Sequence, residues 1–111
     1  MPNYESLNHF TASEFNEPDK MNQLLLALLD QMRGIAGIPI KITSSYREGD
    51  PLSHGDGDGV DLACVSSSDR LRLVRAAVEA GFVRIGVYTR HVHVDVSERL
   101  PQNVMWVGES K

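Results

Sequence analysis

The sequence predicts an α+β domain in which flanking helices pack on a small antiparallel sheet. Two apolar segments have helical spacing, near residues 18–35 and 69–80, and the segments around them have strand-like alternation or short apolar runs. The resulting order, helix, strand, loop, strand, helix and hairpin, favours an α+β fold. With 111 residues, 41% of them hydrophobic, the chain can bury one modest core, so we expect a single domain over residues 1–111.

Ordinary start and stop signals delimit the predicted elements. Thr11 and Glu14 have the spacing of a capping box in a short helical entry at 8–15. Leucines and methionines three and four apart predict the helix over 18–35, and Gly34 and Gly37 are expected to end it. The buried stripe of the second helix is expected to be Leu71, Val74, Ala77 and Val78. Strands are predicted over 38–46, 60–65, 82–88 and 91–96, and the C-terminal VMWV segment either adds an edge strand or covers a pocket.

Composition excludes several classes of function. The net charge of −4 and the scattered Lys and Arg residues argue against a nucleic-acid-binding protein. The longest apolar run, LLLALL at 24–29, is too short to cross a bilayer, and MPNYESLNHF lacks the features of a secretory signal. The single cysteine, Cys64, cannot form an intrachain disulfide and is expected to be a buried apolar residue. We expect a monomer that is synthesised in the cytoplasm and has no membrane partner.

The segment LSHGDGDGVDL, residues 52–62, holds the first candidate metal ligands. His54 and Asp61 are separated by a loop of alternating glycine and aspartate, and the glycines allow positive φ angles and a tight reversal. The loop runs into an apolar strand, so the imidazole and the carboxylate can approach one point. Both groups are suitable zinc ligands, but a site needs a third.

The most regular alternation in the chain, HVHVDV at 91–96, supplies that third ligand. Side chains alternate along a strand, so the valines face one way while His91, His93 and Asp95 face the other. One of the two histidines can complete a set of two imidazoles and one carboxylate with the residues of the loop. Three protein ligands and an open fourth position are the pattern of catalytic zinc.

Two other interpretations of the loop were weighed. The aspartates can serve only turns and caps, with HVHVDV as a half-exposed strand. An EF-hand is excluded because its register puts His54 at position 1 and Val65 at position 12, where acids are required. Calcium binding by Asp56 and Asp58 stays open.

The motifs together resemble one family, the zinc D-Ala-D-Ala carboxypeptidases and related peptidoglycan peptidases, in particular its compact phage-type members. His54, Gly57 and Asp61 match the family's H-x-x-G-x-A-x-D signature, and HVHVDV is similar to its H-x-D strand. ITSSYR resembles its S-G-Y-R segment, and NHFTASEF and VMWVG are similar to its opening and closing segments. The resemblance implies a fold shared with hedgehog signalling domains and one Zn²⁺ per chain, held by His54, Asp61 and His93.

The resemblance also implies roles for residues around the metal. It makes His91, Asp95 and Arg47 catalytic, with Arg47 at the substrate-binding arginine, and it adds Ser53 and Tyr46 as substrate-binding residues.

Two positions depart from the family pattern. Gly59 replaces the alanine of the signature, and Arg90 stands where some members carry an acid as general base. The base is then Asp95, His91 or another acid such as Glu48. The side-chain pKa favours His91 for proton transfer, and Asp95 is expected to support it.

The expected function is hydrolysis of peptide bonds in peptidoglycan stem peptides, by a D,D-carboxypeptidase or an endopeptidase such as a phage lysin acting on the host cell wall. The alternative is a non-catalytic, zinc-bearing phage structural or binding module, part of the virion, with the same fold. Both agree with the absence of a visible signal sequence.

Overall fold

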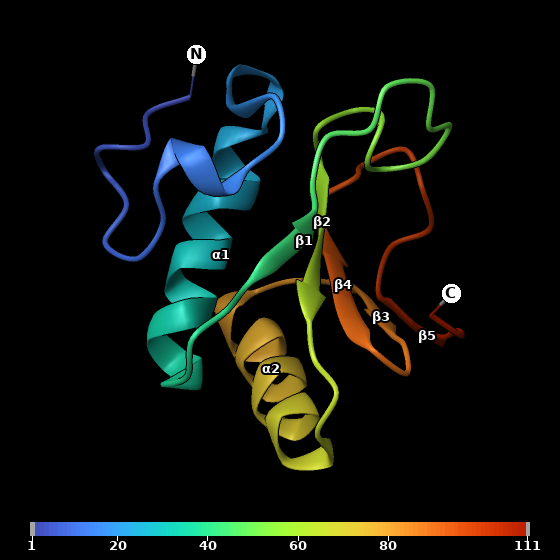
Figure 1. Ribbon diagram of the computed structural model, residues 1–111. Helices are drawn as coiled ribbons and strands as arrows, with labels where there is room; N and C mark the ends of the chain where they lie inside the picture. Colours follow the sequence, from blue (N-terminus) through green and yellow to red (C-terminus); the bar gives the residue numbers. More distant parts are fainter. Residues whose placement is uncertain (1, 111) are drawn as a thin grey trace.

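The computed structural model describes residues 2–110, which form two helices and a five-stranded sheet, with both helices on one side of the sheet (Figure 1). This arrangement confirms the predicted α+β class. Two short 3₁₀ turns, Ala12–Glu14 and Pro18–Lys20, precede the first helix. The main elements are α1 (Gln23–Ala36), β1 (Ile42–Ser44), β2 (Gly59–Ala63), α2 (Ser67–Ala80), β3 (Arg84–Val87), β4 (His91–Asp95) and β5 (Val104–Val107).

The sheet is mixed, which corrects the prediction of an antiparallel sheet. The strand order is β1-β2-β4-β3-β5, and the first three pairings are antiparallel. The VMWV segment forms β5, which pairs with β3 in parallel, with Arg84 opposite Val104 and Gly86 opposite Trp106. The chain after β4 returns along the sheet before it adds this strand, so β5 runs in the same direction as β3.

The first helix is shorter than its apolar pattern predicted. Residues 18–20 form a 3₁₀ turn, and α1 begins only at Gln23, because the Asn22 side chain caps it by accepting the backbone N–H groups of Leu24 and Leu25. Gly34, also expected to end the helix, lies inside it. The helix ends at Gly37, whose φ of 68° is the left-handed conformation of a C-terminal cap.

The second helix confirms only part of the predicted stripe, because Ala77 is buried as expected but its neighbours in the stripe are not. Leu71 and Val78 are exposed, and Val74 is partly buried. The buried residues are Leu73, Ala76, Ala77 and Ala80. The three alanines on this face let α2 approach α1 closely, while Leu71 and Val78 remain at the surface. The helix also begins earlier than predicted, with Ser66 as its cap.

The core lies between the helices and one face of the sheet. Val92 and Val94 of β4 are fully buried in it together with leucines of α1, as the alternation of HVHVDV predicted. Cys64 is buried as expected. The predicted strand over 38–46 is reduced to Ile42–Ser44. Because the valines of β4 face the helices, its histidines and Asp95 face the opposite side of the sheet.

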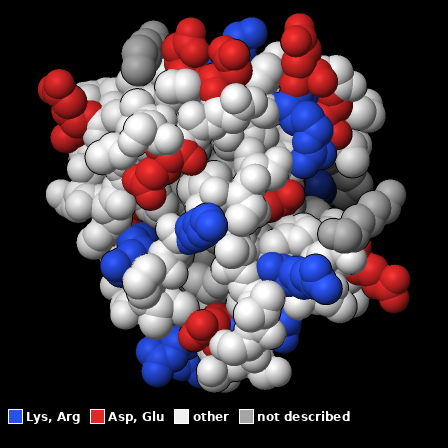
Figure 2. Space-filling view, in the orientation of Figure 1, with Lys and Arg blue, Asp and Glu red and all other residues white. Residues whose placement is uncertain are grey.

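The surface carries both signs of charge. Figure 2 shows acidic and basic side chains interspersed over one face of the molecule, with no extended patch of a single sign on that face. Within residues 2–110, neither helix is long and apolar enough to cross a membrane.

Candidate metal centre

Three predicted ligands, His54, Asp61 and His93, meet on the face of the sheet away from the helices. Asp61 in β2 lies directly opposite His93 in β4, and the loop between β1 and β2 brings in His54. Asp61 Oδ1 is 3.2 Å from His54 Nε2 and 2.9 Å from His93 Nδ1. Potential ligand atoms of all three residues lie within 4.8 Å of one another.

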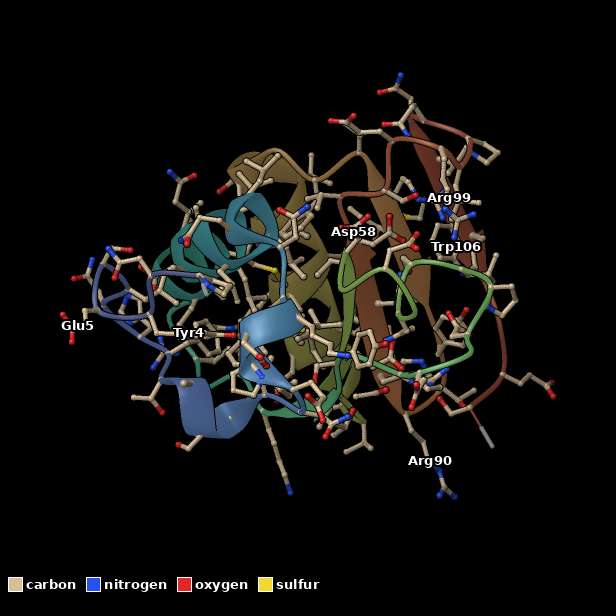
Figure 3. The ribbon with its side chains drawn as sticks, turned by 90° about the horizontal axis from the view of Figure 1, so that it is seen from above. Tyr4, Glu5, Asp58, Arg90, Arg99 and Trp106 are labelled. Atoms are coloured by element: carbon tan, nitrogen blue, oxygen red, sulfur yellow. The ribbon has the colours of Figure 1, made fainter. Side chains whose placement is uncertain are left out.

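The loop that carries His54 is anchored at several points. Gly57 has a φ of 74° and packs against the carbonyl of Lys20, so a side chain here would clash with that backbone. Its own carbonyl accepts the N–H of Asn22 at 2.9 Å. Figure 3 shows Arg99 beside this loop, where its guanidinium bonds Asp56 Oδ2 at 2.8 Å. Gly57 alone in the loop has a positive φ among residues 52–62, fewer than the three glycines suggested.

Each imidazole is oriented by its second nitrogen. His54 Nδ1 lies 2.7 Å from the Ser45 carbonyl, which can only accept, so Nδ1 carries the proton and Nε2 presents its lone pair toward Asp61. His93 Nε2 lies 2.6 Å from Asp95 Oδ2, and its Nδ1 faces Asp61. Metal-ligating histidines have this arrangement, in which the outer N–H is donated to a carbonyl or carboxylate.

The groups around Asp61 favour the binding of a cation. With both outer nitrogens protonated, two imidazole lone pairs and the Asp61 carboxylate face one another. Burial alone would raise the pKa of Asp61, but hydrogen bonds with His54 and His93 lower it. Burial would lower the pKa of His93, but bonds with Asp61 and Asp95 raise it. The ligand atoms of the three residues lie close enough together to hold a metal ion. Two imidazoles and one carboxylate fit zinc.

A cleft of about 310 Å³ opens over the three ligands. Arg47 lines it and is half exposed; its Nη2 lies 3.9 Å from Asp61 Oδ2 and donates to Ser44 Oγ at 2.8 Å. The guanidinium therefore sits beside the candidate centre with donors left for a ligand. The other residues that line the cleft are Asp50, Leu52, Ser53, Arg84, Tyr88, His91 and Trp106.

His91 lies in this cleft next to the three ligands. Its Nε2 is 3.9 Å from Asp61 Oδ1, too long for a hydrogen bond, while its ring stacks on Tyr88 with centroids 4.2 Å apart. The Tyr88 hydroxyl accepts the indole N–H of Trp106 at 2.8 Å. Burial lowers the pKa of His91, and the nearby charge of Asp61 acts in the opposite direction. His91 can meet a bound molecule without occupying the ligand position of His93.

Asp95 lies behind His93 and not in the cleft. It is 1% exposed, and it accepts bonds from His93 at one oxygen and from Arg84 Nε and Ser97 N at the other, at 2.6 and 3.1 Å. Burial would raise its pKa, but the bonds with His93 and Arg84 lower it, so the group is an anion. The carboxylate is engaged on both sides in holding an imidazole and a buried guanidinium.

The other candidate residues divide into two groups. Ser53 lines the cleft, with its Oγ 3.3 Å from His93 Nε2. Tyr46, expected to bind substrate, does not line it: its ring packs against the core with Lys20 Nζ 4.9 Å from the ring centroid. Glu48 is exposed in the adjoining turn outside the cleft, and Arg90 extends into solvent (Figure 3).

Sequence reasoning missed Arg84, Tyr88 and Trp106 as parts of the site. The segment that contains Trp106 was expected to add a strand or to cover a pocket. The segment does both, since β5 joins the sheet and the Trp106 indole lines the cleft. Arg84 is buried, a rare position for a guanidinium. It pairs with Asp95, donates to the Pro101 carbonyl at 2.6 Å and lies 5.0 Å from the centre of the Trp106 ring.

Comparison with known proteins adds no assignment. No family model, no curated protein and no solved structure matches this chain. What the site can do chemically therefore rests on its own geometry.

Proposed function

We propose that this protein is a zinc-dependent peptidase that hydrolyses peptide bonds in peptidoglycan stem peptides, with the hedgehog and D-Ala-D-Ala carboxypeptidase type of fold. The observation that carries the proposal is the convergence of His54, Asp61 and His93, with the outer nitrogen of each imidazole fixed by an acceptor. An adjoining cleft that also contains a cation and a further histidine supports it.

The three converging residues would hold the ion. When bound, zinc lowers the pKa of water toward about 7 and polarises a peptide carbonyl. The Ser45 carbonyl and the Asp95 carboxylate keep the two imidazoles in the tautomers that bind metal. One position around the metal is left for water or substrate, because the cluster supplies three protein ligands.

His91 and Asp95 divide the remaining roles. His91 lines the cleft and can move a proton or stabilise negative charge on a substrate oxygen. Asp95 has both oxygens bonded to protein groups, so we assign it the support of His93 and not proton transfer. The exposed Glu48 lies outside the cleft, which makes it a weaker base candidate than His91.

Arg47 would bind a substrate carboxylate. Its guanidinium is 52% exposed at the cleft, and its planar fork can donate two parallel hydrogen bonds to a carboxylate. Peptidoglycan stem peptides carry such groups. Ser53 lies on the cleft wall but is only 2% exposed, so we assign its hydroxyl to the packing around His93 and not to direct contact with the peptide.

A second candidate is a zinc-bearing structural or binding module without turnover. The feature that favours it is Arg90, which occupies the position of the acid in the resembling family and extends into solvent (Figure 3). Asp95 does not replace that acid in the cleft, because its carboxylate lies behind His93. Under this alternative the metal stabilises the loop and the sheet without cleaving a bond.

Metal analysis beside a cell-wall digestion assay tests both. We expect one zinc per chain in the wild type and its loss in His54→Ala, Asp61→Ala and His93→Ala. His9→Ala, a control on an exposed histidine, should keep the zinc. Release of peptide fragments or free D-alanine from purified peptidoglycan by the wild type supports the peptidase. A full complement of zinc without any cleavage supports the structural module. Zinc retained by any of the three alanine variants refutes the ligand set.

A further inference from the structure

The chain after β5 returns to the start of β4 and contacts His91. The Ser110 N–H is donated to Thr89 Oγ1 at 3.2 Å, and the Arg90 N–H is donated to Ser110 Oγ at 2.9 Å. The same Ser110 oxygen lies 2.8 Å from His91 Nδ1. Ser110, 19 residues away in sequence, is thus held against Nδ1 of His91, the ring nitrogen that does not face Asp61.

Ser110 Oγ has one proton and two lone pairs, so it can bond His91 Nδ1 in either direction, and the need to place its hydroxyl proton favours donation to the ring. Ser110 Oγ already accepts one N–H, and its single hydroxyl proton remains to be donated. Among residues 2–110, His91 Nδ1 is the acceptor in reach of that proton. The bond is therefore made best with an unprotonated Nδ1, and a neutral imidazole then carries its proton on Nε2.

The surroundings of the opposite nitrogen favour the same tautomer. His91 Nε2 lies 3.9 Å from Asp61 Oδ1, so an N–H there points toward negative charge, whereas a lone pair would face it. Stacking on Tyr88, with ring planes 12° apart, fixes the orientation of the imidazole. The bond with Ser110 thus favours one tautomer of His91, and stacking on Tyr88 fixes the plane of its ring.

We propose that Ser110 is a positioning residue that holds neutral His91 as the Nε2–H tautomer and so presents a hydrogen-bond donor to the cleft. This rests on the proposed function and makes it more specific. His91 then donates to the substrate carbonyl oxygen as negative charge develops there, and does not take a proton from water.

Nitrogen-15 NMR of the histidine rings tests the tautomer without any need for turnover. The zinc-loaded full chain is studied at about pH 8, where an ordinary histidine with a pKa of about 6.5 is neutral, and His91→Gln identifies the signals. We expect an unprotonated Nδ1 and a protonated Nε2 for His91, and a mixture of tautomers in Ser110→Ala. A protonated Nδ1 in the wild type overturns the proposal.

Kinetics of the same variants tests the catalytic consequence. Ser110→Ala should retain zinc and lower kcat about 10-fold with little change in KM, the effect of one neutral hydrogen bond. Ser110→Thr keeps a hydroxyl and should restore kcat. Ser67→Ala, on an exposed serine of α2 across the sheet, is the control. Unchanged kcat and tautomer in Ser110→Ala overturn the proposal. A wild type that shows the expected tautomer but cleaves nothing refutes the peptidase and leaves the positioning role of Ser110 standing.

Discussion

Replacing Asp95 with Asn removes the buried anion that holds His93 at the candidate metal centre. Arg84 Nε and His93 Nε2 each donate to Asp95 at 2.6 Å, and the carboxylate is 1% exposed. An amide of the same shape has only one acceptor oxygen, so its NH₂ group must face one of two N–H donors. The buried guanidinium of Arg84 also loses its counter-charge.

The structure gives the size of the effect. Removing one partner of a buried ion pair costs about 3 to 5 kcal/mol, and solvent does not screen a pair this deeply buried. A chain of 111 residues has a free energy of unfolding of about 6 to 16 kcal/mol at the usual value per residue. We therefore expect Asp95→Asn to lower Tm by roughly 10 to 30 °C. Zinc affinity should fall by about 10- to 100-fold, because His93 loses its orienting acceptor.

In EDTA, urea unfolding measures the loss in the free energy of unfolding and thermal unfolding measures the fall in Tm. Competition with a zinc chelator measures the loss of zinc affinity. Asp56→Asn is a matched control, since Asp56 pairs with Arg99 at 2.8 Å but the two side chains are 40% and 50% exposed. Such a pair contributes less than about 1 kcal/mol. If Asp95→Asn were no more destabilising than this control, the buried pair would not have the structural role assigned to it.

Three further outcomes are expected. His91→Ala should keep its zinc by elemental analysis but lose about 2 to 4 orders of magnitude in kcat; loss of zinc instead would make His91 a ligand. Arg47→Lys should keep both charge and zinc, yet kcat/KM on cell-wall peptides should fall, because the bidentate fork is lost; unchanged kcat/KM removes Arg47 from the site. Burial would lower the pKa of His93, but its bonds with Asp61 and Asp95 raise it. Without metal, protonated His93 therefore stabilises the fold. This stabilisation is complete below the pKa of about 6.5 that the histidine has in the unfolded chain, and it is lost as pH rises through its pKa in the folded chain, so the free energy of unfolding should fall with rising pH. With zinc, which needs the deprotonated ring, it should rise. The free energy of unfolding is measured by urea at several pH values, with EDTA and with zinc. The same dependence on pH in both conditions would contradict this assignment.

Local patterns predicted the parts of the site that depend on local geometry. The period of two in HVHVDV separates valines from histidines by face, and β4 has this arrangement. The loop from His54 to Asp61 also brings its two ends together as expected. These outcomes need only backbone alternation and a short reversal, which neighbouring residues determine.

Features that depend on distant pairing could not be predicted in the same way. The direction of β5 depends on the path of the chain after β4, which VMWV does not encode. The burial of Arg84 depends on Asp95 lying opposite it in space. In α2, a count of hydrophobic residues favoured Leu71 and Val78, whereas close approach to α1 favours alanine, because helix packing is sensitive to side-chain size.

Gly59, the first residue of β2, leaves the space that the Ser53 side chain and the candidate ligand His93 occupy. A methyl group here would lie 2.5 Å from Ser53 Oγ and 3.0 Å from His93 Cε1, although the backbone of Gly59 is ordinary. A side chain at position 59 therefore needs space that the Ser53 hydroxyl fills. The Ser53 side chain must turn away or become smaller, or the imidazole of His93 must move.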